Sequence, residues 1–359
     1  MKKKICFILP SLWGHGGAER VAYNLLNNLS LDKFDLHLIL TKEKGDAFKK
    51  LRSEVKYSIL NCRKSRYSII KIYKKLKKIK PDIVIIFSFE ISMLVGVFIS
   101  PFLKNIKFIN RQLNLISKSN FSCLRKIFLK IAYGNFNKII SQSKDMTEDL
   151  MKNIKISKEK IIEINNPVNF KEIKELSEKK MEIEFNSKNK NLLCVGRLSR
   201  QKGFDKIIEI MKLFKGTNIK LYILGIGKER KNLDNMIEKY DLEGTVFLLG
   251  RKRNPYIYMK NADLFILSSR YEGFPNSLLE AGVCGLYSIC NDSPGGINEI
   301  IEEGINGNII DFNNKLEVKN IILKNLYEDK NKDKIRNIVL DRYNLEKIIG
   351  KYSKLLENI

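Results

Sequence analysis

The sequence lacks the residues and motifs on which several large classes of enzyme depend. It has only two histidines, and its six cysteines show no close spacing typical of metal ligands. It has no Asp-x-Asp pair, a common carboxylate holder of a divalent ion, and no G-x-G-x-x-G dinucleotide fingerprint. We therefore expect no bound metal and no other cofactor. The cysteine pattern fits a reducing, cytoplasmic setting.

Acidic residues are scarce relative to basic ones, and the imbalance lies mainly in the first half. The chain has 66 Lys and Arg against 40 Asp and Glu. Residues 1–168 hold 33 basic and 13 acidic side chains, a net charge of +20, whereas residues 169–359 hold 33 and 27. A strongly basic half favours an acidic partner, either nucleic acid or an anionic membrane surface. An AT-rich genome also raises the lysine count, but it explains the total charge better than the asymmetry.

Long uninterrupted hydrophobic runs are few. Residues 83–103 approach the thickness of a bilayer, but Glu90, three serines and Pro101 interrupt them, which favours a strand, a turn and a helix over a membrane span. The start of the chain, three lysines and then the apolar residues 5–9, is similar to a signal peptide. It has no small-residue cleavage site, so we interpret it as the first strand.

The order of apolar runs and glycine loops predicts an α/β chain of two Rossmann-like domains. Residues 5–9 form a strand, followed by a glycine loop and a helix with apolar residues at helical spacing. The same pattern begins again at residues 191–195, with a basic loop at 196–203 and a second amphipathic helix. The polar stretch between them predicts a hinge, and 359 residues are enough for two domains. We place the first domain at 1–168 and the second at 169–340.

One stretch of the second half indicates the kind of ligand. The apolar run 263–267 is followed by a short loop and by a helix that should begin near Pro275, because proline suits the first helical turn. A helix start at the carboxyl end of a strand directs N–H groups and partial positive charge toward an anion. Glu272 and Glu280 are unexpected beside a phosphate alone, but each carboxylate can accept hydrogen bonds from hydroxyl groups. Phosphate together with hydroxyls indicates a sugar nucleotide.

Two further loops offer partners for a diphosphate. Arg197 and Lys202 lie between a strand end and a helix start, where two cations can neutralise a diphosphate leaving group. Gly16 and Gly17 would let a diphosphate approach the backbone at the start of the first helix. The alternative is that these glycines only form a turn.

The amino-acid sequences of these loops resemble those of a known family. Residues 272–281 read Glu-Gly-Phe-Pro-Asn-Ser-Leu-Leu-Glu-Ala, residues 196–203 read Gly-Arg-Leu-Ser-Arg-Gln-Lys-Gly, and residues 16–20 read Gly-Gly-Ala-Glu-Arg. Together they resemble glycosyltransferase family 4, the retaining transferases of GT-B fold. The resemblance implies two Rossmann-like domains facing a cleft, with the donor held mainly by the second. It also implies that residues 341–359 form a helix crossing back to the first domain.

The resemblance also implies roles for individual residues. Arg197 and Lys202 stabilise the departing diphosphate without a metal ion, and Glu272 orients the donor sugar; these three are the catalytic candidates. The implied donor-binding residues are Gly16, Gly17, Arg197, Lys202, Gly225, Gly250, Arg251, Gly273, Phe274, Pro275, Asn276 and Glu280. His15, Glu90 and Arg111 are candidates on the acceptor side. No enzymic nucleophile stands out, so front-face attack by the acceptor hydroxyl is the working hypothesis.

The acceptor is less defined by the sequence than the donor. The basic helix pattern at 71–80 and the basic, aromatic stretch 120–137 suit an anionic bilayer surface, although both also fit solvated outer helices. We expect a hexose or N-acetylhexosamine to pass from a UDP-sugar to a polyprenyl-diphosphate-linked glycan at the inner face of the cell membrane. That chemistry belongs to bacterial capsule, lipopolysaccharide O-antigen or glycan assembly.

Two other classes of protein remain as alternatives. A GT-B sugar-nucleotide epimerase would share the fold and would isomerise free UDP-sugar without an acceptor. A nucleic-acid-binding protein would explain the charge, but it leaves the donor motifs unexplained, and no nucleic-acid-binding module is visible. We therefore expect no nucleic-acid partner.

Overall fold

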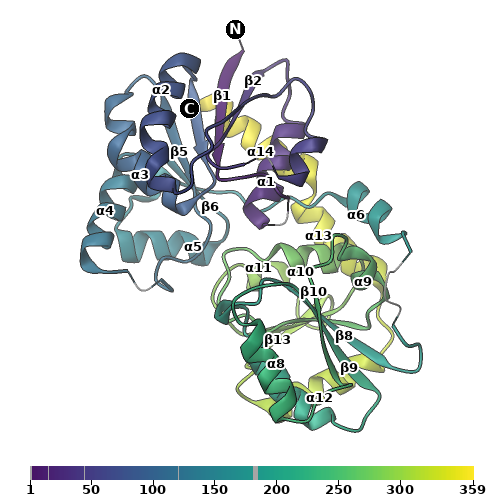
Figure 1. Ribbon diagram of the computed structural model, residues 1–359. Coiled ribbons are helices and arrows are strands. Elements are labelled where there is room, and N and C mark those ends of the chain that lie inside the picture. The colour runs from purple at the N-terminus through teal and green to yellow at the C-terminus, as the bar shows by residue number, and fades with distance from the viewer. Residues whose placement is uncertain (1, 15, 44, 120, 181–184) are drawn as a thin grey trace. The chain divides into compact units, whose positions relative to one another are not determined.

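The chain folds into two compact units, each of which is described by itself. The computed structural model describes residues 2–14, 16–43, 45–119, 121–180 and 185–359. The first unit comprises Met1–Pro167 and Leu345–Ile359, and the second comprises Val168–Asn344. The chain therefore leaves the first unit after Pro167 and re-enters it at Leu345 (Figure 1).

The first unit is built on a parallel sheet of seven strands. Their order is β3-β2-β1-β4-β5-β6-β7. The strands are β1 Lys3–Leu9, β2 Phe34–Leu40, β3 Lys56–Ile59, β4 Ile83–Ile86, β5 Lys107–Arg111, β6 Lys138–Ser141 and β7 Ile161–Glu163. Ile5 of β1 pairs with Leu36 on one side and Ile83 on the other. Strand β4 at the centre is apolar and buried at every position, because helices cover both faces of a parallel sheet.

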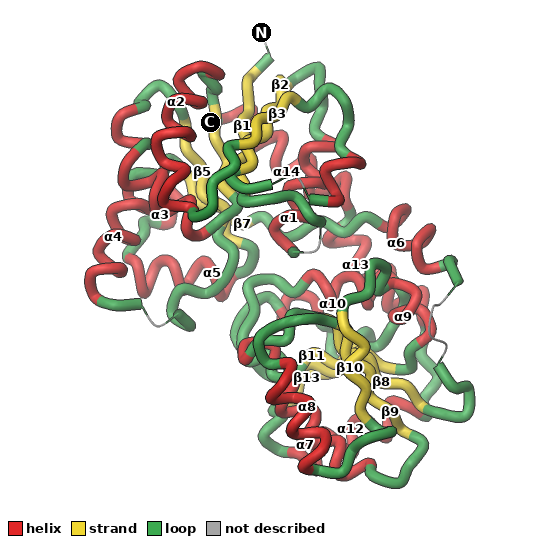
Figure 2. Tube along the Cα trace, in the orientation of Figure 1, coloured by secondary structure: helices red, strands yellow, loops and turns green. Residues whose placement is uncertain are grey.

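Alternate residues of β1 enter the two halves of the core. Ile5, Phe7 and Leu9 pack with α1 and α14, whereas Cys6 and Ile8 pack with α2, α3 and α4. Figure 2 shows the strands in yellow between these red helices. The helices are α1 Gly17–Asn28, α2 Ile69–Ile79, α3 Phe89–Phe98, α4 Cys123–Gly134, α5 Lys144–Asp149 and α14 Leu345–Asn358. Short helical turns lie at Asp46–Lys50, Ser65–Ser68, Ser100–Phe102, Leu150–Ile154 and Lys158–Lys160.

The apolar segment 83–103 forms β4 and α3, joined by a two-residue turn, as the interrupting residues predict. None of the helices in the described ranges combines the length and the apolar character needed to cross a membrane.

The second unit repeats the architecture with a parallel sheet of six strands. Their order is β10-β9-β8-β11-β12-β13. The strands are β8 Lys190–Val195, β9 Ile219–Leu224, β10 Val246–Gly250, β11 Leu264–Leu267, β12 Ser288–Asn291 and β13 Gly307–Ile310. The helices are α6 Phe170–Ser177, α7 Phe204–Met211, α8 Arg230–Lys239, α9 Tyr256–Asn261, α10 Asn276–Val283, α11 Ile297–Ile300, α12 Lys315–Leu326 and α13 Lys332–Tyr343, with 3-10 turns η6 Arg200–Lys202 and η7 Lys212–Phe214. Leu192 and Cys194 face one core cluster and Leu193 faces the other.

Both sheets are doubly wound and change direction next to their first strand. The order reverses between β1 and β4 in the first unit and between β8 and β11 in the second. In open α/β sheets, ligands bind outside the carboxyl ends of the strands at such a switch point. The predicted α/β class with two Rossmann-like folds is confirmed. Strands β3 and β13 were not predicted; both are short edge strands of four residues.

Candidate functional site

The loop after β8 meets the end of β11 at the switch point of the second sheet. Gly203 separates η6 from α7 and has a φ of +63°, a left-handed conformation that favours glycine. A Cβ atom at this position would lie 2.1 Å from the carbonyl oxygen of Ser268. Glycine therefore allows the basic loop to touch the backbone that follows β11.

This contact brings Lys202 and Glu272 together. The Nζ atom of Lys202 lies 2.6 Å from Oε1 of Glu272, and the hydroxyl of Ser269 donates to the same oxygen at 2.5 Å. Glu272 is only 5% exposed. A buried carboxylate needs such partners, because an unpaired charge in the interior is costly. The catalytic candidates Lys202 and Glu272, 70 residues apart in the chain, thus form one pair.

The backbone around Glu272 is held from the neighbouring strand. Asn291, at the end of β12, donates from Nδ2 to the carbonyl of Ser269 at 2.9 Å and accepts from the amide of Phe312. The amide of Glu272 donates to the carbonyl of Pro294 at 2.9 Å. Sequence reasoning missed Ser269 and Asn291. The pair of serines directly after the apolar strand 264–267 was the available signal for the first; no local signal marks the second.

Arg197 lies in the same loop but differs from Lys202 in its environment. Its side chain is exposed and has no hydrogen bond or ion pair with a residue that the structure describes. In the basic loop Lys202 is therefore already paired, whereas the guanidinium of Arg197 is open to an anionic ligand.

A second ion pair, also missed from the sequence, fixes the loop. Arg270 donates to both carboxylate oxygens of Asp205 on α7, at 2.7 Å for Oδ1, and to the carbonyl of Arg200 at 2.8 Å. Burial acts to raise the pKa of Asp205, but the hydrogen bonds and charge of Arg270 outweigh it and hold that pKa below its ordinary value. The bidentate pair ties the start of α7 to the segment after β11.

The segment Gly273–Asn276 leads into α10, whose first residue, Asn276, follows Pro275 as predicted. The ring of Phe274 packs edge-on against Tyr343 at 5.3 Å between centroids. The glycine loop after β12 lies against this segment: a Cβ at Gly296 would be 2.2 Å from the Phe274 ring. Glu280 lies one turn into α10 and is buried. The two carboxylates of the motif are thus both held inside the second unit.

The predicted glycines after β9 and β10 bring strand ends together. The amide of Gly225 donates to the carbonyl of Gly250 at 2.8 Å, and a Cβ on Gly225 would lie 1.8 Å from the carbonyl oxygen of Gly196. Arg251 follows at an exposed position. These residues lie at the carboxyl ends of the strands, as the basic loop does. Their role in binding the donor stays a prediction.

The corresponding turn of the first unit is filled by the protein's own carboxylate. Gly17 begins α1, and Glu19 accepts hydrogen bonds from the amides of Gly14 at 3.1 Å and Gly16 at 3.5 Å. The hydroxyl of Ser11 donates to the other oxygen of Glu19 at 3.0 Å. The amide of Gly16, expected to face a diphosphate, therefore already has an anionic partner in this structure.

The three acceptor-side candidates fall into different environments. Glu90 is exposed in the first turn of α3 and accepts from the Ser65 hydroxyl at 2.7 Å. Arg111 is 1% exposed; it donates to the Tyr352 hydroxyl at 3.2 Å and to the Asn166 side chain. Arg111 is thus held inside the first unit by hydrogen bonds, and its role on the acceptor side stays a prediction. His15 lies outside the described residues.

Within the ranges that the structure describes, no group of three or more His, Cys, Asp or Glu side chains is placed to hold a metal ion. The cations of the candidate site are instead Arg197 and Lys202.

These features define an α/β protein of the GT-B class with its polar site at the switch point of the second sheet. Two family models match the chain: "Glycosyltransferase Family 4" over residues 15–172 and "Glycosyl transferases group 1" over residues 177–340. The chain belongs to glycosyltransferase family 4 and is a glycosyltransferase.

Relatives of known name agree with this assignment. The chain is 31% identical, over 98% of its length and 99% of the relative's, to the N-acetylgalactosamine-N,N'-diacetylbacillosaminyl-diphospho-undecaprenol 4-alpha-N-acetylgalactosaminyltransferase of Campylobacter jejuni. It is 24% identical, over 86% of both chains, to the amylovoran biosynthesis glycosyltransferase AmsD of Erwinia amylovora. Its fold is similar to that of Anabaena Alr3699/HepE in complex with UDP and glucose, with a TM-score of 0.80, 19% identity and coverage of 99% and 100% of the two chains.

Proposed function

We propose that the protein transfers a hexose or N-acetylhexosamine from a UDP-sugar to a saccharide carried on polyprenyl diphosphate, with retention of configuration and without a metal ion. The observation that carries the proposal is the Lys202–Glu272 pair, which Ser269 supports at the carboxyl ends of β8 and β11. It combines a cation for the diphosphate with an acceptor for sugar hydroxyls in one place.

Lys202 can serve two anions at once. An ammonium group has three N–H donors, and one of them is directed at Oε1 of Glu272. The others remain for diphosphate oxygens, and the exposed guanidinium of Arg197 adds a bidentate partner. Charge that develops on the departing diphosphate is then stabilised by donors already in position, which is the most effective form of electrostatic catalysis.

The carboxylates of Glu272 and Glu280 bind different parts of the donor. Glu272 accepts hydrogen bonds from hydroxyls of the donor sugar, and Glu280, deeper in α10, accepts from the ribose. Because Glu272 is neutralised by Lys202 and is not a free nucleophile, attack by the acceptor hydroxyl on the face that the diphosphate leaves is the mechanism we favour.

The donor nucleotide and the acceptor are proposed from the relatives. The structure of Alr3699/HepE contains UDP and glucose, which supports a uridine diphosphate donor. The Campylobacter relative is named for an undecaprenol-diphosphate-linked acceptor, and AmsD is named for amylovoran biosynthesis. These names support a lipid-linked glycan acceptor in capsule, O-antigen or protein-glycan assembly at the cytoplasmic face of the membrane.

Donor binding is tested first by thermal unfolding with UDP, GDP, ADP and their sugars, in buffer without metal and again with EDTA. We expect a rise in Tm with UDP and UDP-sugars that EDTA does not remove. Transfer is then measured with labelled UDP-sugar and a polyprenyl-diphosphate saccharide. Isomerised UDP-sugar in the absence of acceptor would identify an epimerase instead, and a Tm rise that EDTA abolishes would contradict the metal-free proposal.

The surface of the first unit supports contact with an anionic membrane. Helix α4 exposes Leu124, Ile127 and Ile131 by 65%, 57% and 47%, and their spacing places them on one helical face. Arg125, Lys126 and Lys130 occupy the same helix, and α3, which packs beside α4, ends at the exposed Phe98. Apolar side chains flanked by cations are typical of helices lying at an anionic interface.

Cys123 provides a direct probe of this contact. It is the first residue of α4 and the exposed one of the six cysteines, the others being buried or partly buried. A polarity-sensitive dye on Cys123 should shift with phosphatidylglycerol vesicles but not with phosphatidylcholine vesicles. Replacing Leu124 and Ile127 by Gln should remove the shift, whereas Leu316→Gln, on an exposed apolar residue of the second unit, should keep it. A shift of equal size in the double variant would contradict the proposed surface.

A further inference from the structure

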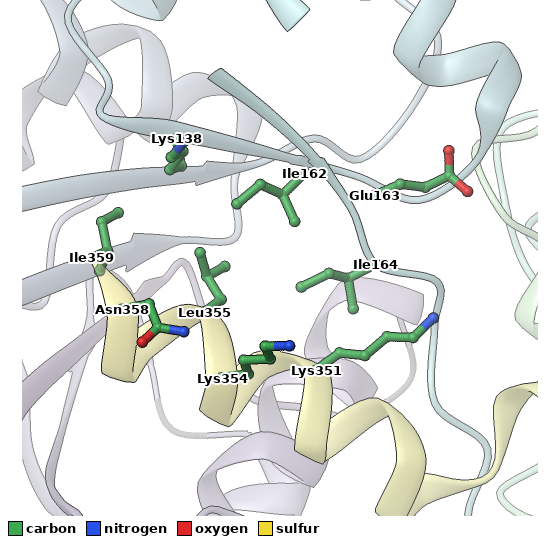
Figure 3. A pocket seen from close by; sticks show the side chains of 9 residues that line it. All are labelled: Lys138, Ile162, Glu163, Ile164, Lys351, Lys354, Leu355, Asn358 and Ile359. Atoms are coloured by element: carbon green, nitrogen blue, oxygen red, sulfur yellow. The ribbon is translucent and has the colours of Figure 1, made fainter. Parts of the chain in front are cut away.

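A cavity of about 400 Å³ lies between the edge strand β7 and helix α14 of the first unit (Figure 3). Among the described residues β7 pairs only with β6, so no further described strand covers its outer edge. The lining residues on α14 run from Lys351 to Asn358, roughly 10 Å at 1.5 Å per residue, and Ile359 follows the helix. The cavity is therefore long, and its volume falls in the range of small-molecule sites.

The floor of this cavity is apolar. Ile162 and Ile164 project from one face of the strand segment toward Leu355 and Ile359 of the helix, whereas Glu163, between them, points elsewhere (Figure 3). Alternation along an extended segment produces this separation. A ligand in the cavity would thus meet branched aliphatic side chains along its length.

The rim of the cavity is cationic. Lys138, Lys351 and Lys354 line it, and Glu163 is the one acidic side chain among the lining residues. Lys138 donates to the carbonyl of Glu159 at 2.6 Å. The amines of Lys351 and Lys354 have no hydrogen bond or ion pair with a residue in the described part of the chain, and Figure 3 shows both projecting from the helix toward the strand. The ammonium groups of Lys351 and Lys354 thus lie at one side of the apolar cavity, where they can bind an anion.

We propose that this cavity binds a single-chain amphiphile with an anionic head, such as a fatty acid. The linear tail lies on Ile162, Ile164 and Leu355, and the head is held by Lys351 and Lys354. Charge complementarity selects the anionic head, because the two lysines lack partners of their own. The elongated aliphatic floor selects a linear tail over a compact polar ligand. The cavity belongs to the first unit, whereas Lys202 and Glu272 belong to the second.

Binding is measured by calorimetry on the full chain with dodecanoate below its micelle concentration. Dodecyl maltoside, with a neutral head, and butyrate, with almost no tail, are the comparison ligands. We expect one dodecanoate per chain, weaker binding of dodecyl maltoside by about tenfold and no detectable binding of butyrate. Multiple weak sites, or equal binding of the neutral amphiphile, would overturn the proposal.

Variants locate the site. Lys351→Glu with Lys354→Glu should weaken dodecanoate by at least about tenfold, because two attractive charges become repulsive. Lys332→Glu with Lys334→Glu, on two exposed lysines of α13, is the charge-matched control and should change nothing. A dodecanoate carrying a photoreactive diazirine should label peptides that contain Ile162 or Leu355. Labelling elsewhere, or equal loss of affinity in the control, would refute the site. If an extended peptide that pairs with β7 displaced dodecanoate, the cavity would be a site for a peptide strand and not for a lipid tail, and the proposal would be overturned.

Discussion

The two units have the same strand order but use the turn after their first strand differently. In the second unit, the turn after β8 carries Arg197 and Lys202, and Lys202 is paired with Glu272 from the loop after β11. In the first unit, the turn after β1 holds the carboxylate of Glu19, which accepts from loop amides. The fold therefore provides equivalent positions, and the sign of one side chain decides whether the turn attracts an anion or already holds one.

The distribution of charge shows the same division. Residues 1–168 carry 33 basic and 13 acidic side chains, and helices α2 and α4 hold eight of the basic ones. The second half is nearly balanced and concentrates its functional cations in one loop. The net charge of the first unit thus supports the proposed contact with an anionic surface. In the second unit, a few positioned charges support the proposed binding of the diphosphate.

The sharpest test of this contrast is Lys202→Ala. We expect turnover to fall by about 10²–10³-fold, the usual cost of removing one donor to charge that develops in the transition state. Transfer kinetics with saturating UDP-sugar measure it, and Lys231→Ala, on the exposed face of α8, is the matched control. Turnover within a few-fold of the unchanged protein would break the assignment of the basic loop to the diphosphate.

Glu280→Gln should have a smaller effect and one of a different kind. Losing a charged acceptor for the ribose hydroxyls should raise the KM for UDP-sugar by roughly tenfold while kcat changes little. Initial rates over a range of donor concentrations separate the two constants, and Glu243→Gln, in an exposed loop, serves for comparison. A fall in kcat with unchanged KM would place Glu280 at the reacting sugar instead.

Glu19→Ala probes the turn of the first unit. Because the carboxylate caps the amides before α1, its loss should lower the free energy of unfolding by about 1 kcal/mol. Urea unfolding measures the stability, and turnover should stay within a few-fold. If turnover fell as far as in Lys202→Ala, the two turns would share the donor and the contrast between them would disappear.

The smallest effect is expected at the Arg270–Asp205 pair. The folded-state pKa of Asp205 is lowered, so the pair stabilises the protein above the ordinary Asp value of 3.8, and this contribution is lost as the pH falls through the folded-state pKa. Both side chains are partly exposed, so Arg270→Met should cost less than about 1 kcal/mol at pH 7. The difference should disappear in strong acid; Arg253→Met is the control. A difference that persists in acid would mean that packing, not charge, is responsible.

Much of the fold could be predicted because its signals are local. The apolar runs that became β1, β4, β8 and β11 are continuous, and Pro275 marks the start of α10. Strand β3 could not be recognised because it lies at an edge and exposes Lys56 and Tyr57, so its sequence does not alternate as a buried strand does.

The candidate site was harder to predict where it depends on contacts between residues that are far apart in the sequence. Arg197, Lys202 and Glu272 stand in recognisable loops, but the 2.6 Å contact between Lys202 and Glu272 depends on how two crossovers meet. Asn291 supports Glu272 from a third strand, without any local pattern. The burial of Arg111 could not be predicted either, because its partner Tyr352 lies 241 residues later in the chain.

The return of α14 to the first unit has a consequence for biosynthesis. Ile348, Tyr352 and Leu356 of this helix fill the same core as β1 and α1, although all of the second unit is translated between them. During translation, N-terminal domains usually fold first. Here one face of the first sheet stays incompletely covered until residues 345–358 leave the ribosome. Until then Arg111 also lacks its Tyr352 partner. The second unit, which is continuous in sequence, can finish folding before the first.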